Sequence, residues 1–226
     1  MFPPALLSSS MFPHATPGRT LTKICGLTSL PEALHCAEAG ADAIGINFYP
    51  KSKRYHPLNK AALWLTKLPP GLVRVAVLVN TPADELHRIA TSGVIDVLQF
   101  HGDEPSEGLI AARRYGLPII KALPLLPDTT PASLLAWPAD ALLLDAYAPG
   151  TYGGTGHTID WTRAAAVIAG LAPFPIILSG GLTADNIQAA VSQTRPAGVD
   201  VASGVEHSPG RKDPDKVRSF LQNALA

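Results

Sequence analysis

Residues 21–47 read LTKICGLTSLPEALHCAEAGADAIGIN and contain one complete repeat of the pattern that runs through the chain. A short apolar run at 21–25 is followed by a turn, a segment with polar and apolar faces, a glycine and a second apolar run at 43–47. Short apolar runs predict buried strands, and the longer two-faced segment predicts a helix. The stretch therefore predicts a strand, a crossover helix and a second, parallel strand.

The same alternation continues along the chain and predicts eight strands, at Leu21–Cys25, Ala43–Asn47, Val73–Val79, Val97–Phe100, Ile119–Ala122, Ala141–Asp145, Ile176–Ser179 and Val199–Ala202. Eight strands that alternate with helices fit a closed (βα)8 TIM barrel of parallel strands. The alternative, an open doubly wound sheet, usually has a G-x-G-x-x-G turn after its first strand. Here the first strand ends in Cys25-Gly26, and the glycine-rich turns come late. We therefore predict a single-domain α/β barrel over residues 21–226.

Residue types that favour helix ends lie between these strands. Helix starts are predicted where a side-chain oxygen can accept from free backbone N–H groups, at Ser29, Thr81 and Thr183. Helix ends are predicted at Gly40, Gly93, Gly116 and Gly170. Each crossover is then long enough to return the chain for a parallel strand.

The composition excludes several classes of partner. The chain has 226 residues, 46% of them hydrophobic, with 18 basic and 18 acidic residues. The lack of net charge and of a basic stripe with interleaved aromatics argues against nucleic-acid binding. The longest apolar stretches, 75–79 and 141–144, fall short of the roughly 20 residues that a membrane helix needs. We expect neither a nucleic-acid nor a membrane partner.

The cysteines and the N-terminal residues bear on the compartment. Cys25 and Cys36 cannot form a disulfide framework, which favours a reducing compartment, the cytoplasm. No pair of histidines has the spacing of a metal site, so no metal is expected. Residues 1–20 hold four prolines and lack the basic start and apolar core of a secretory signal. We expect a flexible N-terminal tail there.

Three glycine-rich segments follow the last three predicted strands, at 152–156, 179–181 and 203–205. Glycine lets the backbone approach a phosphate group and turn its N–H groups toward it. A single Gly-Gly pair would more often be only a tight turn. Barrels recurrently hold phosphate in the loops after strands seven and eight. We therefore predict phosphate binding by Gly154, Gly156, Gly180, Gly181, Ala202, Ser203 and Gly204.

Three further side chains are candidates for chemistry at the ends of strands, where barrel active sites lie. Cys25 ends the first strand and could act as a base or nucleophile, or be a small buried apolar residue. Asp145 ends the sixth strand and should face the barrel mouth, or it caps the following loop. Arg54 follows the second strand and offers a planar fork suited to a carboxylate, or it lies in a solvated loop.

Together these motifs resemble phosphoribosylanthranilate isomerase, a family of the tryptophan pathway, over residues 21–226. The resemblance is carried by Lys23–Gly26, Gly45–Tyr55, Gln99–Glu104, Gly153–Trp161, Ser179–Gly181 and Ser203–Glu206. Ala202 stands where a second serine is expected, so that position would contribute its backbone alone. Phe100 stands where leucine is commoner.

The resemblance implies an Amadori rearrangement that converts N-(5-phosphoribosyl)anthranilate into 1-(2-carboxyphenylamino)-1-deoxyribulose 5-phosphate, without a cofactor or metal. By resemblance, Asp145 is the general acid, Cys25 is the general base and Arg54 binds the anthranilate carboxylate. His101 either lines the site or orders its loop. Asp200 is expected to anchor neighbouring loops, with lining of the site as the alternative. The partner is then a small phosphorylated substrate, and the chain acts as a monomer or homodimer.

Rival functions make different demands on the sequence. The related isomerase of histidine biosynthesis acts on a substrate with two phosphates and should show glycine-rich clamps in both halves. The loop after the third strand, 80–83, has none. Indole-glycerol-phosphate synthase would need a catalytic lysine and glutamate set that cannot be placed here. A non-catalytic phosphosugar-binding barrel is the other alternative, and the presence of Cys25 and Asp145 argues against it.

Overall fold

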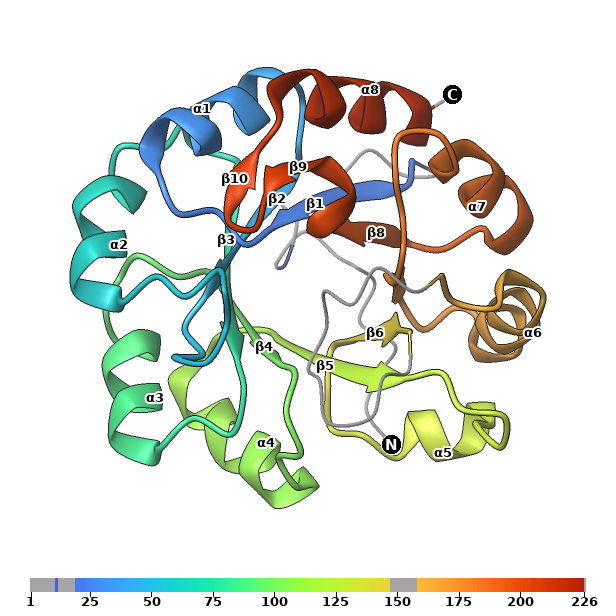
Figure 1. Cartoon of the computed structure of the whole chain (residues 1–226). Helices are drawn as coiled ribbons and strands as arrows, with labels where there is room; N and C mark the ends of the chain where they lie inside the picture. The colour runs from blue at the N-terminus through green and yellow to red at the C-terminus, as the bar shows by residue number, and fades with distance from the viewer. Residues whose placement is uncertain (1–10, 12–18, 147–157, 226) are drawn as a thin grey trace.

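The eight barrel strands lie around the barrel in chain order, and β8 pairs with β1 to close it (Figure 1). The computed structural model describes residues 11, 19–146 and 158–225. The barrel strands are β1 Leu21–Cys25, β2 Ala43–Asn47, β3 Val73–Leu78, β4 Val97–Phe100, β5 Ile119–Pro124, β6 Ala141–Asp145, β7 Ile176–Leu178 and β8 Gly198–Val201. All neighbouring pairs are parallel. The predicted barrel is confirmed, and no strand end differs from its predicted position by more than two residues.

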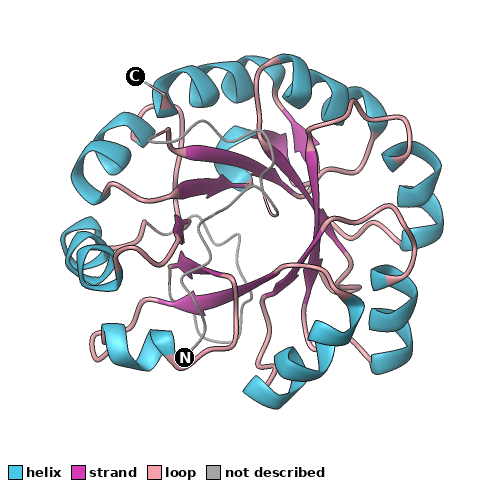
Figure 2. Cartoon of the chain, turned by 180° about the vertical axis from the view of Figure 1, so that it is seen from behind, coloured by secondary structure: helices cyan, strands magenta, loops and turns pink. Residues whose placement is uncertain are grey.

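Helices surround the strands on the outside (Figure 2). They are α1 Leu30–Glu38, α2 Leu58–Leu65, α3 Ala83–Ala90, α4 Ser106–Ala112, α5 Pro131–Leu135, α6 Trp161–Leu171, α7 Ile187–Thr194 and α8 Pro214–Ala224, with short turns η1 Arg113–Tyr115 and η2 Ser203–Val205. Successive strand residues point to opposite faces. Ile24 therefore packs in the core shared with the helices, whereas Leu21 packs in a separate inner core. By the same alternation, Lys23 and Cys25 point into the barrel.

Some predicted helix boundaries are correct and others are wrong. Ser29 occupies the N-cap of α1 as predicted, but its hydroxyl donates to Glu32 Oε2 instead of accepting from a backbone N–H group, and α3 has Pro82 rather than Thr81 at its N-cap. The expected helix start at Thr183 is wrong, because a turn intervenes and α7 begins at Ile187 after the N-cap residue Asn186. The Thr183 backbone N–H donates to Asn186 Oδ1 at 2.8 Å within that turn.

Gly170 does not end a helix, although Gly40, Gly93 and Gly116 do lie at or just beyond helix ends. It lies inside α6, facing α5. A Cβ atom at Gly170 would lie 2.8 Å from Cγ of Pro131. This glycine therefore allows close packing of two helices, a role that local sequence does not distinguish from a helix stop.

A short antiparallel hairpin, β9 Glu206–Ser208 and β10 Arg211–Lys212, lies between η2 and α8. Thr28 Oγ1, in the loop after β1, donates to the Gly210 carbonyl oxygen at 3.0 Å. The Lys212 backbone N–H donates to Glu32 Oε1 of α1 at 3.0 Å. The hairpin was not predicted, since strands of three and two residues leave no periodic pattern. It places Glu206 and Lys212 beside the end of β1.

Met11 is the one described residue before Arg19. Its side chain is 4% exposed and belongs to the inner core, together with Leu21, Val73 and Val75. Met11 therefore packs with barrel residues, and the other residues at 1–10 and 12–18 lie outside the described part of the chain. Within the described residues, no helix is both long and apolar enough to span a membrane.

Candidate active site

Cys25 lies at the end of β1 beside a buried ion pair. Lys23 Nζ, on the same face of the strand, donates to Asp200 Oδ1 of β8 at 2.7 Å. Gly45 of β2 is in register with Cys25, and a Cβ atom there would lie 2.7 Å from Cys25 Sγ and 3.2 Å from Lys23 Nζ. The missing side chain at Gly45 leaves the space that the thiol and the ammonium group share. Asp200 thus anchors Lys23 across the β1–β8 contact.

The ion pair and burial have opposite effects on the thiol. Burial raises the pKa of Cys25, and the Lys23 ammonium group partly offsets this increase. Burial also disfavours the charged form of Lys23, but the Asp200 carboxylate outweighs that effect and raises the pKa of Lys23 above its ordinary value. Lys23 therefore remains a fixed positive charge next to the position where a thiolate would form.

The pKa of Cys25 can be tested by alkylation. We expect iodoacetamide to modify Cys25 slowly at neutral pH and faster as pH rises, because the thiolate reacts and its pKa is raised. Cys36 should stay unmodified over the same range, because burial raises its pKa to about 12, and peptide mass spectrometry separates the two sites. Lys23→Met should slow modification of Cys25 further. Modification of Cys25 at neutral pH as fast as that of an exposed thiol would contradict this prediction.

Asp145, at the end of β6, contacts His101 across the barrel mouth. Asp145 Oδ2 lies 3.2 Å from His101 Nε2, and Asp145 Oδ1 accepts from the Ala146 backbone N–H at 2.8 Å. His101 Nδ1 lies 3.2 Å from the side-chain nitrogen of Gln99. Nε2 is therefore the ring nitrogen that faces Asp145, while Nδ1 faces Gln99. His101 thus lies beside the carboxyl group of Asp145, which lines the pocket described below.

A pocket lies between the loops that follow β7 and β8. Its lining includes Asp145, Ser179, Gly180, Gly181, Asp200, Ala202, Ser203 and Gly204. Gly180 has a φ of +87°, which favours glycine, and its Cβ would lie 2.7 Å from the Ala146 nitrogen. A Cβ at Gly204 would overlap the Leu182 carbonyl oxygen. The structure therefore brings together the predicted phosphate-binding residues of these two loops, whereas Gly154 and Gly156 lie outside the described residues.

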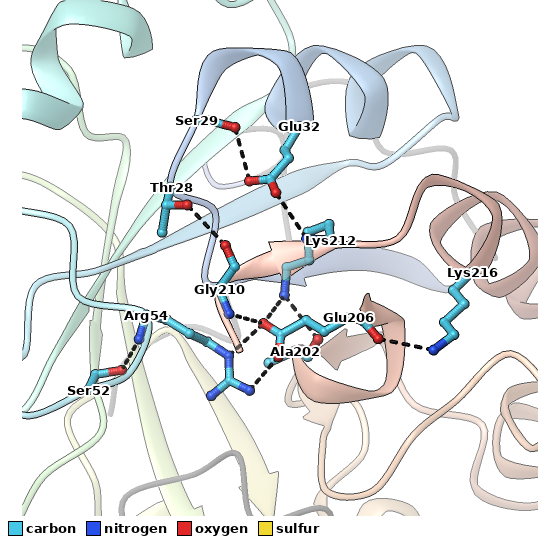
Figure 3. Close-up of polar contacts among 10 residues, drawn as sticks. All are labelled: Thr28, Ser29, Glu32, Ser52, Arg54, Ala202, Glu206, Gly210, Lys212 and Lys216. Carbon is cyan, nitrogen blue, oxygen red and sulfur yellow. Dashed lines mark hydrogen bonds and ion pairs between the residues drawn. The ribbon is translucent and has the colours of Figure 1, made fainter. Parts of the chain in front are cut away.

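Arg54 lies in the loop after β2 and forms a bidentate ion pair with Glu206 (Figure 3). Its Nε and Nη2 atoms donate to the two carboxylate oxygens, each at 2.7 Å. Lys212 Nζ donates to Glu206 Oε1 at 2.9 Å. The hydrogen bonds that Arg54 donates to Glu206 raise the pKa of Arg54, so the guanidinium stays charged.

Sequence reasoning did not assign a role to Lys23, Glu206 or Lys212. A signal was available for Lys23, because a residue two positions before Cys25 on a strand must share its face. No comparable signal existed for Glu206 and Lys212, which meet Arg54 only through the hairpin. Among the described residues, no group of three His, Cys, Asp or Glu side chains could hold a metal ion.

Comparison with known proteins identifies the family. The family profile described as N-(5'-phosphoribosyl)anthranilate (PRA) isomerase matches residues 22–223. The chain belongs to the phosphoribosylanthranilate isomerase family. Relatives named N-(5'-phosphoribosyl)anthranilate isomerase include that of Geobacter metallireducens, 45% identical over 205 residues, covering 90% of this chain and 98% of the relative. That of Pseudomonas fluorescens is 44% identical and covers 89% of this chain and 93% of the relative.

Solved structures of the family have the same barrel. The enzyme from Thermotoga maritima has a TM-score of 0.82 and 36% identity, covering 91% of this chain and 98% of that one. A structure of the isomerase in complex with reduced 1-(o-carboxyphenylamino)-1-deoxyribulose 5-phosphate has a TM-score of 0.79 and 35% identity, covering 91% of this chain and 98% of that one. The family, the fold and the isomerase activity implied by the sequence motifs are confirmed.

Proposed function

We propose that the chain catalyses the Amadori rearrangement of N-(5-phosphoribosyl)anthranilate to 1-(2-carboxyphenylamino)-1-deoxyribulose 5-phosphate, a step of tryptophan biosynthesis. One observation carries this proposal: a thiol beside a buried cation and a carboxyl group beside a histidine lie at the barrel mouth that also holds the glycine-lined pocket. The solved relative that binds the reduced form of this product supports the same ligand class.

Asp145 acts as the general acid in the first step. Ring opening breaks the bond between the anomeric carbon and the furanose oxygen, and the oxygen needs a proton as the bond breaks. Asp145 lines the pocket, where its Oδ1 accepts from the Ala146 backbone N–H and its Oδ2 lies beside His101 Nε2. Proton donation leaves a hydroxyl group on the sugar and an iminium at the anomeric carbon.

Cys25 acts as the general base in the second step. The iminium makes the proton on carbon two of the sugar acidic, and the Cys25 thiolate takes it to give an enolamine. Gain of a proton at carbon one and loss of the hydroxyl proton at carbon two then give the ketose. The enzyme is left with a proton on Cys25 rather than on Asp145, and the proton returns before the next turnover. The fixed charge of Lys23 stabilises the thiolate that this cycle requires.

The substrate is held at both ends. Its phosphate binds in the pocket formed by Gly180, Gly181, Ala202, Ser203 and Gly204, and the sequence motif adds Gly154 and Gly156 as phosphate-binding residues. Arg54 binds the anthranilate carboxylate at the other end. Two anchored ends convert binding energy into orientation of the sugar between the acid and the base. The scheme uses side chains of the protein alone and calls for no metal or cofactor.

Loss of substrate fluorescence tests the activity. Purified protein should remove the fluorescence of N-(5-phosphoribosyl)anthranilate in a protein-dependent manner and yield the ketose. The two-phosphate substrate of the histidine-pathway isomerase, assayed in parallel, should react much more slowly. Failure of correctly folded protein to turn over the anthranilate substrate would overturn the proposed function.

We also propose a cytoplasmic location and action as a monomer or homodimer. Cys25 and Cys36 are free thiols, which agrees with a reducing compartment. The Thermotoga maritima relative is described as a dimeric enzyme that also yields monomers. Light scattering after size-exclusion chromatography distinguishes the two states, and a larger assembly would contradict both.

A further inference from the structure

The Glu206 carboxylate lies between Arg54 and Lys212 and accepts hydrogen bonds from both (Figure 3). We propose that these two residues position Arg54 for the substrate carboxylate and join it to the phosphate-binding loop, so that they set the selectivity for a carboxylated aromatic amine. This inference rests on the proposed function, because it assigns a task to residues around the proposed carboxylate site. Arg54, Glu206 and Lys212 are called the charge triad below.

The pairing with Glu206 uses one hydrogen-bonding edge of the Arg54 guanidinium and leaves the other edge available for a ligand. Glu206 takes the side-on edge, through Nε and Nη2. A guanidinium has five N–H donors, so the end-on edge, made of Nη1 and the second N–H of Nη2, can still receive a carboxylate with two parallel hydrogen bonds. Among the described residues, none accepts a hydrogen bond from Nη1, since the side-chain hydrogen bonds of Arg54 use Nε and Nη2. Glu206 thus fixes the direction of that edge.

Lys212 keeps the triad positive. A lone Glu206 would neutralise Arg54, whereas two cations and one anion leave one positive charge in excess. Burial raises the pKa of Glu206, but the Arg54 hydrogen bond and the Lys212 charge outweigh it and lower the pKa overall. Burial lowers the pKa of Lys212, and Glu206 limits that decrease. Each charge therefore depends on the others, and the excess charge suits a single carboxylate.

Lys212 also reaches the other end of the substrate site. Its Nζ donates to the Ala202 carbonyl oxygen at 2.9 Å as well as to Glu206 Oε1 at 2.9 Å. Ala202 lines the pocket assigned to the phosphate. One ammonium group therefore holds both the carboxylate end and the phosphate end. The spacing between the two ends is fixed by a side chain that touches neither group of the substrate.

Paired substrates and paired variants test the proposal. Wild type, Glu206→Gln and Lys212→Met are assayed with the anthranilate substrate and with the carboxylate-free substrate formed from ribose 5-phosphate and aniline. Arg54→Ala provides the reference for loss of the carboxylate contact. Lys216→Met is the matched control, because Lys216 Nζ donates to the Glu206 main-chain oxygen at 3.0 Å and not to its carboxylate.

We expect Glu206→Gln to raise KM for the anthranilate substrate roughly tenfold or more, with kcat much less affected. Without the carboxylate of Glu206, Arg54 no longer holds the orientation that its charge-assisted contact with the substrate carboxylate needs. KM for the carboxylate-free substrate should not change. Lys212→Met should raise KM for both substrates and weaken binding of inorganic phosphate, since it also frees Ala202. Lys216→Met should behave like wild type.

Equal effects of Glu206→Gln on both substrates, or no effect on either, would overturn the positioning role. If Glu206→Gln does not fold, judged by thermal unfolding, Glu206→Asp carries the same test, because a shorter side chain cannot keep the bidentate geometry. Wild-type protein that neither reacts with the anthranilate substrate nor binds its reduced product analogue would overturn the proposed function instead. If wild type turns over the anthranilate substrate but Glu206→Gln affects both substrates equally, the positioning role of the charge triad is overturned and the proposed function stands.

Discussion

Asp145→Asn should lower kcat by about 10²–10⁴-fold while leaving affinity for the reduced product analogue largely unchanged, because general acid catalysis contributes roughly that factor. Asparagine has nearly the same shape, and its single amide oxygen can still accept the Ala146 hydrogen bond, whereas its NH2 group then faces His101. It cannot donate a carboxylic proton to the furanose oxygen. Stopped-flow or steady-state fluorescence gives kcat, and calorimetry gives the affinity for the analogue.

Asp140→Asn is the matched control for this variant. Asp140 directly precedes β6, at the opposite end of the strand from Asp145, and pairs with Arg113. Its replacement should alter stability without changing turnover per folded molecule. Asp145→Asn with kcat near wild type would show that another group protonates the ring oxygen.

Cys25→Ser should lower kcat to a comparable extent. A hydroxyl group fills nearly the same volume as a thiol but is a much weaker base, so removal of the carbon-two proton becomes slow. Lys23 stays charged in this variant because it remains paired with Asp200. The decrease in kcat therefore measures the loss of the base and not a change in the surrounding charge. Single-turnover measurements isolate this step, because ring opening by Asp145 should remain intact.

Cys36→Ser is the control for the thiol substitution. Cys36 is buried on α1, and its replacement should change stability rather than turnover. Activity retained by Cys25→Ser would point to a different base, and the Lys23–Asp200 pair would then be the next group to test.

The barrel could be predicted because each strand is determined by a short stretch of sequence. A buried strand such as β6 is a continuous apolar run that ends in a polar residue, Asp145, and the end of such a run is where a barrel places its chemistry. The glycine-rich loops were equally visible, since a residue without a side chain is conspicuous in any sequence. The fold and the positions of the site residues along the strands can therefore be predicted from short segments of the sequence.

The electrostatic environment could not be predicted in this way. The Lys23–Asp200 pair joins the first and last strands, and it exists only because the barrel closes. Arg54 was expected to point a free fork at a ligand, yet half of that fork is held by Glu206 from a hairpin with no periodic signature. Contacts between residues more than 150 positions apart depend on the assembled fold rather than on local pattern.

Gly204 illustrates how the pocket limits change in the sequence. Every single-nucleotide change of a glycine codon that yields a different amino acid adds a Cβ atom, and at Gly204 that atom would overlap the Leu182 carbonyl oxygen. Gly108 on α4 is the contrasting case, because an added Cβ would meet its nearest atom, in Pro105, at 3.8 Å. Substitution at Gly108 is therefore tolerated, and alanine there would favour the helix. At Gly204, no residue reachable by one nucleotide change fits without moving the backbone.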